Sequence, residues 1–233
     1  MLIYNYKKRL KDLRGISTGD IPKMHHDINI VKDTNSLLSE LFNVIMAKDQ
    51  KYGSRWLIGL ERYVQDQKKS IERRFTRNLS RGHIIEVELF GHFNKELTFL
   101  HPAVVLYDNN RGQLLVAPIS STKYNDNDPL HIDVDSSDGL HHGSGICLEA
   151  IRGVDKNRVL YQYDYKGRKA KVRTEVLDKI DLTIMEYFLP TTFKQFKKLE
   201  DELDKERKKV IDLEEENEFL RKQLDKETVP FAE

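Results

Sequence analysis

The chain has 233 residues, of which 39% are hydrophobic and 33% charged, and its formal net charge is +1. No run approaches the roughly 18 consecutive apolar residues of a membrane-spanning helix, and the first basic residues follow a short apolar run instead of preceding it, which is the wrong order for a secretory signal. Cys147 is the single cysteine, which excludes an internal disulfide framework and a multi-cysteine zinc site. We therefore expect a cytoplasmic protein with no membrane partner, no cofactor and no metal site.

Charge is unevenly distributed along the chain. Residues 1–80 carry 16 basic and 9 acidic residues, whereas residues 81–190 carry 13 and 16, and residues 191–233 carry 10 and 13. A basic N-terminal third can attract phosphate backbones or an acidic protein. A solvated helix surface would have the same composition, so both interpretations stay open.

Two helices are predicted in the first segment, residues 1–80. Polar residues at 34–36, followed by Glu40, indicate a helix start, and apolar residues then recur at helical spacing to Ile45. A break is expected at residues 52–54 around Gly53, before a second helix whose apolar stripe runs from Trp56 to Phe75. The aromatic residues of this stripe fit a core better than base stacking.

The second segment, residues 81–190, changes to short apolar runs rich in β-branched residues, with turn residues between them. Many short strands at close spacing are typical of a small β-barrel, and a helical pattern starting at Glu175 follows the last of them. The predicted strands cover residues 84–89, 103–107, 114–119, 130–134, 145–148 and 158–161.

The third segment, residues 191–233, has the heptad pattern of a coiled coil over about four repeats, with one polar d position. Asn217 occupies an a position, which favours a parallel pair of helices in register. In that arrangement three g residues face e residues of opposite charge on the partner. The sequence therefore predicts a parallel homodimer through this helix, the alternative being a helix that folds back on the N-terminal helices. The a positions are Phe196, Leu203, Val210, Asn217 and Leu224, the d positions are Leu199, Glu206, Leu213 and Leu220, and the g–e pairs are Glu202–Arg207, Lys209–Glu214 and Glu216–Arg221.

Four motifs in order give the second segment its resemblance to a known family. They are Arg-Gly-His-Ile-Ile at residues 81–85, a loop acid followed by His-Pro and an apolar strand at residues 96–106, Pro-Ile-Ser-Ser at residues 118–121, and a longer pattern at residues 144–160 that begins Ser-Gly-Ile and ends Asp-Lys-Asn-Arg-Val-Leu. Together they resemble the PemK/MazF family of toxin ribonucleases. The resemblance covers about 110 residues and neither helical flank.

The resemblance implies an SH3-like barrel, and hence an α+β protein with a helical segment on each side of the barrel. It also implies dimerisation, cleavage of single-stranded RNA without a metal, and an antitoxin protein that occupies the RNA groove. In such cleavage the RNA 2′-hydroxyl attacks its own phosphate, so the protein supplies a base, an acid and charge neutralisation. The family's Arg before the Pro and its Thr or Ser at the next strand end match His101 and Ser120, and Glu96 matches the loop acid. Weaker candidates for RNA contacts are Arg81, Ser121, Lys123 and Arg152.

The chain departs from the family pattern at the centre of this site. His101 replaces an arginine, which is permanently charged and bidentate, although a histidine can act as a general acid or base. Bulky residues, Thr98, Phe99 and Leu100, replace the family's Gly-rich approach. The leading hypothesis is a toxin-type endoribonuclease. The alternative is a catalytically inactive barrel that binds RNA or a protein and is dimerised by its coiled coil, in a regulatory or defence role.

Overall fold

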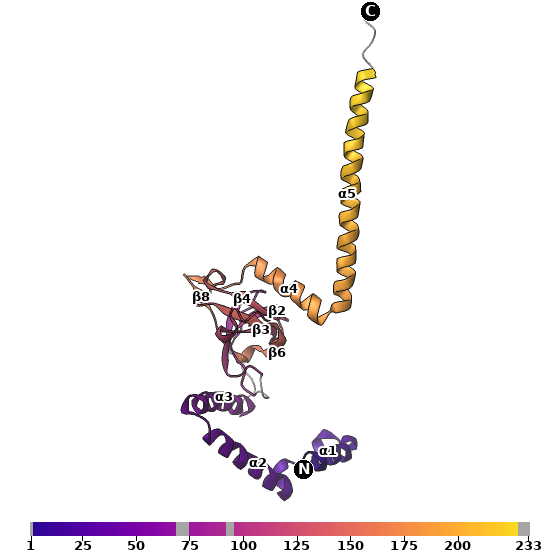
Figure 1. Ribbon diagram of the computed structural model, residues 1–233. Helices are drawn as coiled ribbons and strands as arrows, with labels where there is room; N and C mark the ends of the chain where they lie inside the picture. The colour runs from indigo at the N-terminus through magenta and orange to yellow at the C-terminus, as the bar shows by residue number, and fades with distance from the viewer. Residues whose placement is uncertain (1, 69–74, 92–95, 228–233) are drawn as a thin grey trace, which may run out of the picture. The chain divides into compact units, whose positions relative to one another are not determined.

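The computed structural model describes residues 2–68, 75–91 and 96–227 of the chain. It is divided into two compact units, Met1–Ser70 and Ile71–Glu233 (Figure 1). The expected class, an α+β protein with an antiparallel sheet and helices on both sides of it in sequence, is confirmed. No helix among the described residues is long and apolar enough to cross a membrane.

The N-terminal unit is helical. Its elements are α1 (Leu2–Asp12), three short 3₁₀ turns, α2 (Ile28–Met46) and α3 (Gln50–Lys68). Asp27 caps α2, because its carboxylate accepts hydrogen bonds from the backbone N–H groups of Asn29 at 2.9 Å and Ile30 at 3.2 Å.

Two expectations for this unit are wrong. Asp27 supplies an N-cap before the polar cluster at residues 34–36, so α2 starts earlier than that cluster predicts. The break expected around Gly53 lies instead at residues 47–49, because Asp49 accepts a hydrogen bond from the Tyr52 N–H at 2.8 Å and Gly53 becomes part of α3. Of the predicted second helix, residues 69–74 lie outside the described residues, and Phe75 is not helical.

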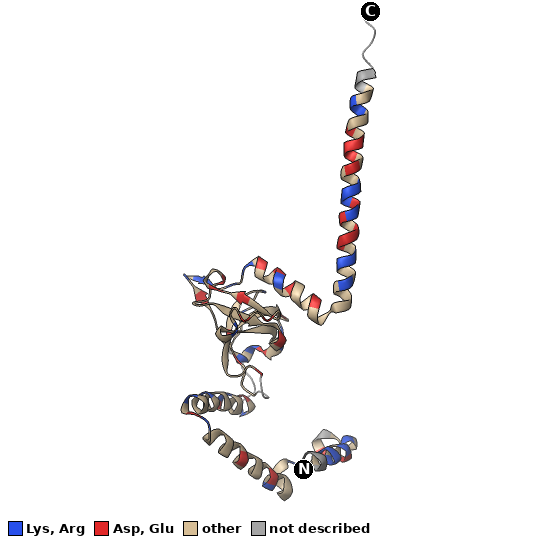
Figure 2. Cartoon of the chain, viewed as in Figure 1, with Lys and Arg blue, Asp and Glu red and all other residues tan. Residues whose placement is uncertain are grey.

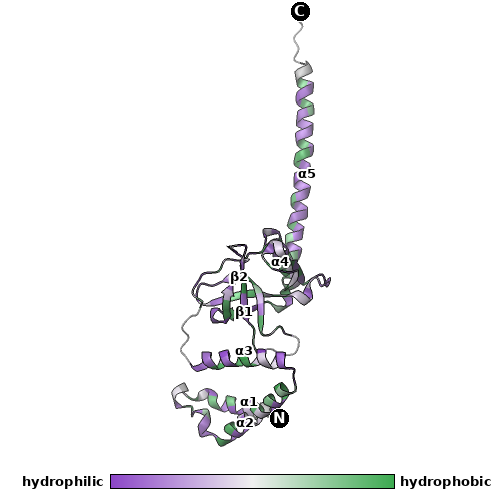
Figure 3. Ribbon diagram, turned by 90° about the vertical axis from the view of Figure 1, so that its left-hand side faces the viewer, coloured by the Kyte–Doolittle hydropathy of each residue, from purple (hydrophilic) through white to green (hydrophobic). Residues whose placement is uncertain are grey.

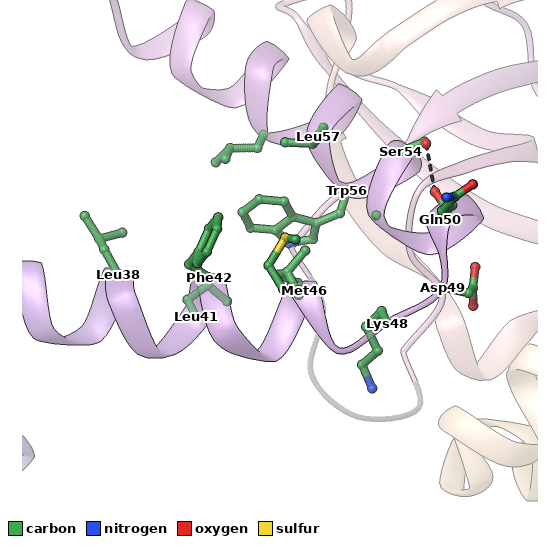
Figure 4. Close-up of a pocket in the computed structure, with 13 residues that line it drawn as sticks. Leu38, Leu41, Phe42, Met46, Lys48, Asp49, Gln50, Ser54, Trp56 and Leu57 are labelled. Carbon is green, nitrogen blue, oxygen red and sulfur yellow. Dashed lines mark hydrogen bonds between the residues drawn. The ribbon is translucent and has the colours of Figure 1, made fainter.

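An apolar groove of about 690 Å³ lies between α2 and α3. Phe42 and Met46 of α2 and Trp56 and Leu57 of α3 lie along it (Figure 4). Phe42, Met46 and Leu57 are each more than 60% exposed, and Gly59 is the one buried residue among the described residues of this unit. Contiguous exposed apolar surface of this kind is unusual on a monomer.

The second unit is built on a seven-stranded antiparallel sheet with the order β4-β5-β3-β2-β1-β7, in which β6 pairs with residues 113–116 of β3, on the edge where β5 pairs with residues 119 and 120. Each run that the sequence predicted as a strand forms one, whereas β6 and the small hairpin of β8 and β9 were not among the predicted strands. The strands are β1 (Ile84–Glu88), β2 (Leu100–Asp108), β3 (Gln113–Ser120), β4 (His131–Val134), β5 (Ser144–Cys147), β6 (Arg152–Asp155), β7 (Val159–Gln162), β8 (Asp164–Tyr165) and β9 (Arg168–Lys169).

The central strands bury side chains on both faces, which explains their nearly continuous apolar sequences. On β2, Val104 belongs to one core and Val105 to the other. The first core also contains Val176 and Ile180 of α4 (Thr174–Phe188), so this helix covers that face of the sheet. The helix predicted to start at Glu175 is thereby confirmed.

Two ion pairs hold loops against the sheet. Lys156 Nζ lies 2.6 Å from Asp108 Oδ2, and both side chains are almost fully buried. Asp108 also accepts the Leu79 N–H at 3.0 Å, which ties the chain that leads into β1 to the end of β2. Asp138, which is fully buried, pairs with Arg173 at 3.0 Å and so fixes the start of α4. Removing one partner of the buried Lys156–Asp108 pair costs about 3–5 kcal/mol.

After α4 the chain enters α5 (Pro190–Glu227), a single long helix. Pro190 fits the first helical position, where its missing N–H has no partner to lose. Lys and Arg alternate with Asp and Glu along α5 (Figure 2), and apolar residues recur along it at intervals (Figure 3). Leu203, Leu213 and Leu220 are between 47% and 56% exposed, so the predicted heptad seam is uncovered in the single chain.

Candidate active site

A pocket of about 680 Å³, called the polar pocket below, is lined by four charged residues and three apolar ones: Glu96, Lys123, Glu149, Arg152, Leu97, Ala150 and Ile151. Glu96 and Leu97 reach it from the loop before β2, and Arg152 reaches it from the start of β6. Arg152 Nη2 donates a hydrogen bond to the Leu97 carbonyl at 3.3 Å and thus holds this loop. Two 3₁₀ turns supply the rest of the wall: Lys123 ends the turn after β3, and Glu149 lies in the turn after β5. The pocket therefore brings together three of the seven predicted site residues, Glu96, Lys123 and Arg152.

Two further predicted residues lie on neighbouring strands. Ala103 of β2 pairs with Pro118 of β3, and continuing this register by two residues places His101 opposite Ser120. The His101 ring contacts the adjacent carbonyl: Nδ1–H donates to the Ile119 oxygen at 3.3 Å. A donating Nδ1 leaves Nε2 as the basic nitrogen of the neutral ring. The Ser120 hydroxyl is almost buried and lies 2.9 Å from the Thr122 hydroxyl.

The loop between Glu96 and His101 contains an unusual backbone conformation. Phe99 has a φ of 65°, in the left-handed region, which is a conformational outlier for a bulky residue. Its side chain is 8% exposed, and its carbonyl accepts the Leu89 N–H at 2.8 Å. These contacts hold a conformation that a glycine would adopt without strain. Such strain concentrates at functional sites, and here it shapes the loop that carries Glu96.

The remaining two predicted residues lie apart from the pocket lining. Ser121 is exposed and begins the 3₁₀ turn that ends at Lys123. Arg81 forms an ion pair with Asp181 of α4, so its charge is engaged at that helix. The sequence alone could not predict that Ser121 lies in the turn next to the pocket whereas Arg81 pairs with α4, because both residues flank strands.

A buried histidine beside the pocket was not predicted. Both ring nitrogens of His131 face carboxylates: Nδ1 lies 2.8 Å from Asp126 Oδ2, and Nε2 lies 3.1 Å from Glu149 Oε1. Burial opposes the charged ring, but the hydrogen bonds with Asp126 and Glu149 outweigh it and raise the pKa of His131. The alternating pattern around residue 131 indicated a strand, and only the fold brings residues 126 and 149 to it.

Lys123 reaches the pocket because of a close backbone contact. A Cβ atom on Gly145 of β5 would lie 2.4 Å from the Lys123 carbonyl oxygen, so glycine is required for the turn after β3 to lie against β5. Lys123 Nζ also lies 3.7 Å from Asp126. The turn, the strand and the buried histidine thus form one connected wall.

A second hollow, of about 540 Å³, is lined by cations of the β8–β9 hairpin, Lys166, Arg168 and Lys169, together with Lys171. It adjoins Gly139, which follows β4, whereas the polar pocket adjoins the turn after β5. Because β4 and β5 are antiparallel, the two hollows lie at opposite ends of this pair of strands.

The polar pocket has the groups that RNA transesterification requires. Glu96 is a carboxylate that can move a proton, and Lys123 and Arg152 can neutralise charge on a phosphate. Cys147 is excluded as a nucleophile, because burial raises the pKa of its thiol to about 12 and the thiolate is the reactive form.

Comparison with known families finds one match within the second unit, to toxins of type II toxin-antitoxin systems. The matching family model is described as PemK-like, MazF-like toxin, and it spans residues 80–188, somewhat under half of the chain. Residues 80–188 are therefore a PemK/MazF-type toxin domain, to which the chain adds helices on both sides, as the resemblance in the sequence predicted.

Solved structures of similar proteins are shorter than this chain. The Mycobacterium tuberculosis toxin MazF-mt6 is 15% identical, with a TM-score of 0.36, and the match covers 46% of this chain and 95% of that one. MazF from Deinococcus radiodurans is 18% identical, with a TM-score of 0.38 and coverage of 47% and 96%. The MazE-MazF structure from the same organism is 18% identical, with a TM-score of 0.36 and coverage of 49% and 96%. No curated protein matches the chain.

Proposed function

We propose that the chain is a toxin-type endoribonuclease that cleaves single-stranded RNA without a metal in the reaction. The observation that carries the proposal is the PemK/MazF family match over residues 80–188, in which the predicted Glu96, Lys123 and Arg152 line one pocket.

The proposed roles follow from residue chemistry. His101 Nε2 and Glu96 are the candidates for proton transfer to and from the RNA, since the His101 Nδ1–H is engaged with the Ile119 carbonyl. Ser120 and Ser121 supply hydroxyl groups at the end of β3, where they can donate to a phosphate oxygen. Lys123 and Arg152 stabilise the charge that develops on phosphorus. A protonatable histidine in place of arginine makes the reaction depend on pH as well as on charge.

The proposed partners are single-stranded RNA, an antitoxin protein and a second copy of the chain. A relative of this domain has been solved under the description MazE-MazF, and an antitoxin for this chain would bind the barrel at the RNA groove. Dimerisation is assigned to α5, whose uncovered a and d residues and attracting g–e pairs suit a parallel coiled coil. We also propose that the sheet of residues 84–162 closes into the SH3-like barrel that the family resemblance implies.

The test is cleavage of a long unstructured RNA by purified full-length protein in the presence of EDTA. Wild type should produce 2′,3′-cyclic phosphate ends, because the 2′-hydroxyl is the nucleophile. His101→Ala and Ser120→Ala should each retain the wild-type circular dichroism spectrum and cleave about 100-fold more slowly or worse. His142→Ala, which removes an exposed histidine outside the pocket, is the matched control and should cleave at the wild-type rate.

Absence of cleavage by folded wild type, freed of any bound protein and tested across a range of pH, would contradict the proposal. Equal loss of activity in His142→Ala would contradict the assignment of the site to His101.

A further inference from the structure

The polar pocket adjoins a cluster of metal-ligating side chains that RNA cleavage does not use. His131 of β4 and Cys147 of β5 are directly opposite each other in the antiparallel register, and Glu149 lies two residues beyond Cys147. The His131 side chain is 3% exposed, and Cys147 is fully buried. One ligand atom from each of the three residues lies within 4.8 Å of the other two.

We propose that His131, Cys147 and Glu149 bind a zinc ion at the end of the β4–β5 pair, beside the polar pocket. Imidazole, thiolate and carboxylate are the donors that zinc takes, at about 2.0–2.3 Å, so tetrahedral ligand atoms lie about 3–4 Å apart. The three ligand atoms lie within 4.8 Å of one another, so zinc binding requires a closure of up to about 1 Å. Glu149 is the exposed member of the cluster, with a side chain that is 43% exposed, and its Oε1 already lies 3.1 Å from His131 Nε2.

Asp126 completes the arrangement from the other side of the ring. Its carboxylate lies 2.8 Å and 2.9 Å from His131 Nδ1, so Nδ1–H donates to it and Nε2 faces Glu149. Zinc-bound histidines commonly donate their second ring N–H to a carboxylate, which fixes the ring and raises its basicity. The orientation that zinc needs is thus already present.

Without zinc, the Nε2–H proton lies between the imidazole and the Glu149 carboxylate. Zinc would replace that proton and would also displace the thiol proton of Cys147, and both protons pass to solvent. Thiolate and Glu149 carboxylate together carry two negative charges, which neutralise the ion. Soft and borderline donors select against magnesium and calcium, which prefer all-oxygen sites.

An entry path and a fourth ligand are also available. Glu149 lines the polar pocket, so an ion can approach from that side and keep a water molecule in the fourth position. The bound ion would cross-link the turn after β5 to the start of β4. Its role is then to hold the pocket wall, and the inference does not depend on whether the pocket cleaves RNA.

The experiment uses untagged full-length protein, stripped with EDTA and exchanged into metal-free buffer. Competition with a chromogenic chelator should show one zinc ion per chain and no binding of magnesium. Cobalt in place of zinc should give a near-ultraviolet band from thiolate-to-cobalt charge transfer. Zinc should also raise the thermal midpoint of unfolding, because it binds the folded state.

Variants distinguish zinc binding at this site from zinc binding at the exposed histidine pairs of the chain. Glu149→Gln, a surface change that should preserve the fold, should weaken zinc binding at least 10-fold, and Asp126→Asn should weaken it about 10–100-fold. Cys147→Ser should abolish the charge-transfer band. His26→Ala and His142→Ala are the controls and should bind zinc as wild type does.

Three outcomes would overturn the proposal. The first is no stoichiometric zinc binding at micromolar concentration. The second is a cobalt spectrum without a thiolate band. The third is zinc binding that His26→Ala or His142→Ala abolishes and Glu149→Gln leaves unchanged. Should Cys147→Ser fail to fold, Glu149→Gln and the wild-type cobalt spectrum decide the matter.

Discussion

At the scale of single residues, burial and charge make His83 a source of acid sensitivity. His83 Nδ1 accepts the Ser80 N–H at 3.0 Å, which requires that nitrogen to be unprotonated. Burial lowers the pKa of His83 below 6.5, and the nearby Lys171 and Lys169 lower it further. The folded protein therefore holds His83 neutral at a pH where the unfolded chain binds a proton.

The sign of the pH effect follows from this difference. Where the unfolded chain binds more protons, the free energy of unfolding rises with pH. His83 is neutral in both states above about pH 6.5, so its stabilising effect is complete there and declines as pH falls toward the folded pKa. His83→Asn keeps an acceptor for the Ser80 N–H but does not titrate.

Thermal or urea unfolding between pH 5 and pH 7.5 checks this prediction. Wild type should lose stability relative to His83→Asn as pH falls below about 6.5, and the two curves should run parallel above it. His142→Gln controls for removal of a histidine as such. Parallel curves over the whole range would show that His83 makes no contribution.

At the scale of elements, the contact between the turn after β3 and β5 decides the position of Lys123. Gly145 permits that contact, since a Cβ there would meet the Lys123 backbone at 2.4 Å. Gly153 of β6 provides a matched comparison: it also lies in a strand, and a Cβ there would meet nothing within 4 Å.

We predict that Gly145→Ala lowers the free energy of unfolding by about 1–3 kcal/mol, because backbone must move to admit the methyl group. Gly153→Ala should be neutral or slightly stabilising, because alanine reduces the entropy of the unfolded chain. Urea denaturation of the two variants beside wild type measures both effects. Equal stability of the two variants would contradict the steric role of Gly145.

Several elements could be predicted from local pattern, and others could not. Apart from β6, the strands from residue 84 to residue 161 have apolar runs with turn residues between them, so their positions were predictable. The start of α2 was not, because Asp27 forms a cap whose carboxylate reaches two N–H groups of the next turn, whereas the sequence offers an equally polar cluster at residues 34–36. A helix cap forms only where the backbone has the right geometry, and a polar residue type favours that geometry without determining it.

At the scale of the whole molecule, α5 should join two chains. The seam residues are exposed in the single chain, and Asn217 would meet its twin only in a parallel pair in register. Leu213→Lys with Leu220→Lys places charge in that seam. Ile211→Lys with Phe219→Lys places the same charge on exposed apolar residues outside it.

Sedimentation at micromolar concentration should show wild type and the Ile211, Phe219 double variant as dimers of the 27.4 kDa chain. The Leu213, Leu220 double variant should sediment as a lighter species. Asn217→Cys should form an interchain disulfide on mild oxidation, which an antiparallel pair would not allow. A wild-type monomer, or dissociation caused by the Ile211, Phe219 changes, would reject the coiled coil.

By itself the sequence determined the α+β class, the toxin family of residues 80–188 and the chemical types at the pocket, because these depend on local periodicity and on short motifs. Its motifs also predicted Glu96, Lys123 and Arg152 as site residues, and these three residues line one pocket. Only the tertiary structure decided which residues meet. The register of β4 and β5 places His131 opposite Cys147, and loop geometry brings Asp126 and Glu149 to the same ring. Cross-strand pairing joins residues far apart in sequence, and their contact depends on packing that no local pattern specifies.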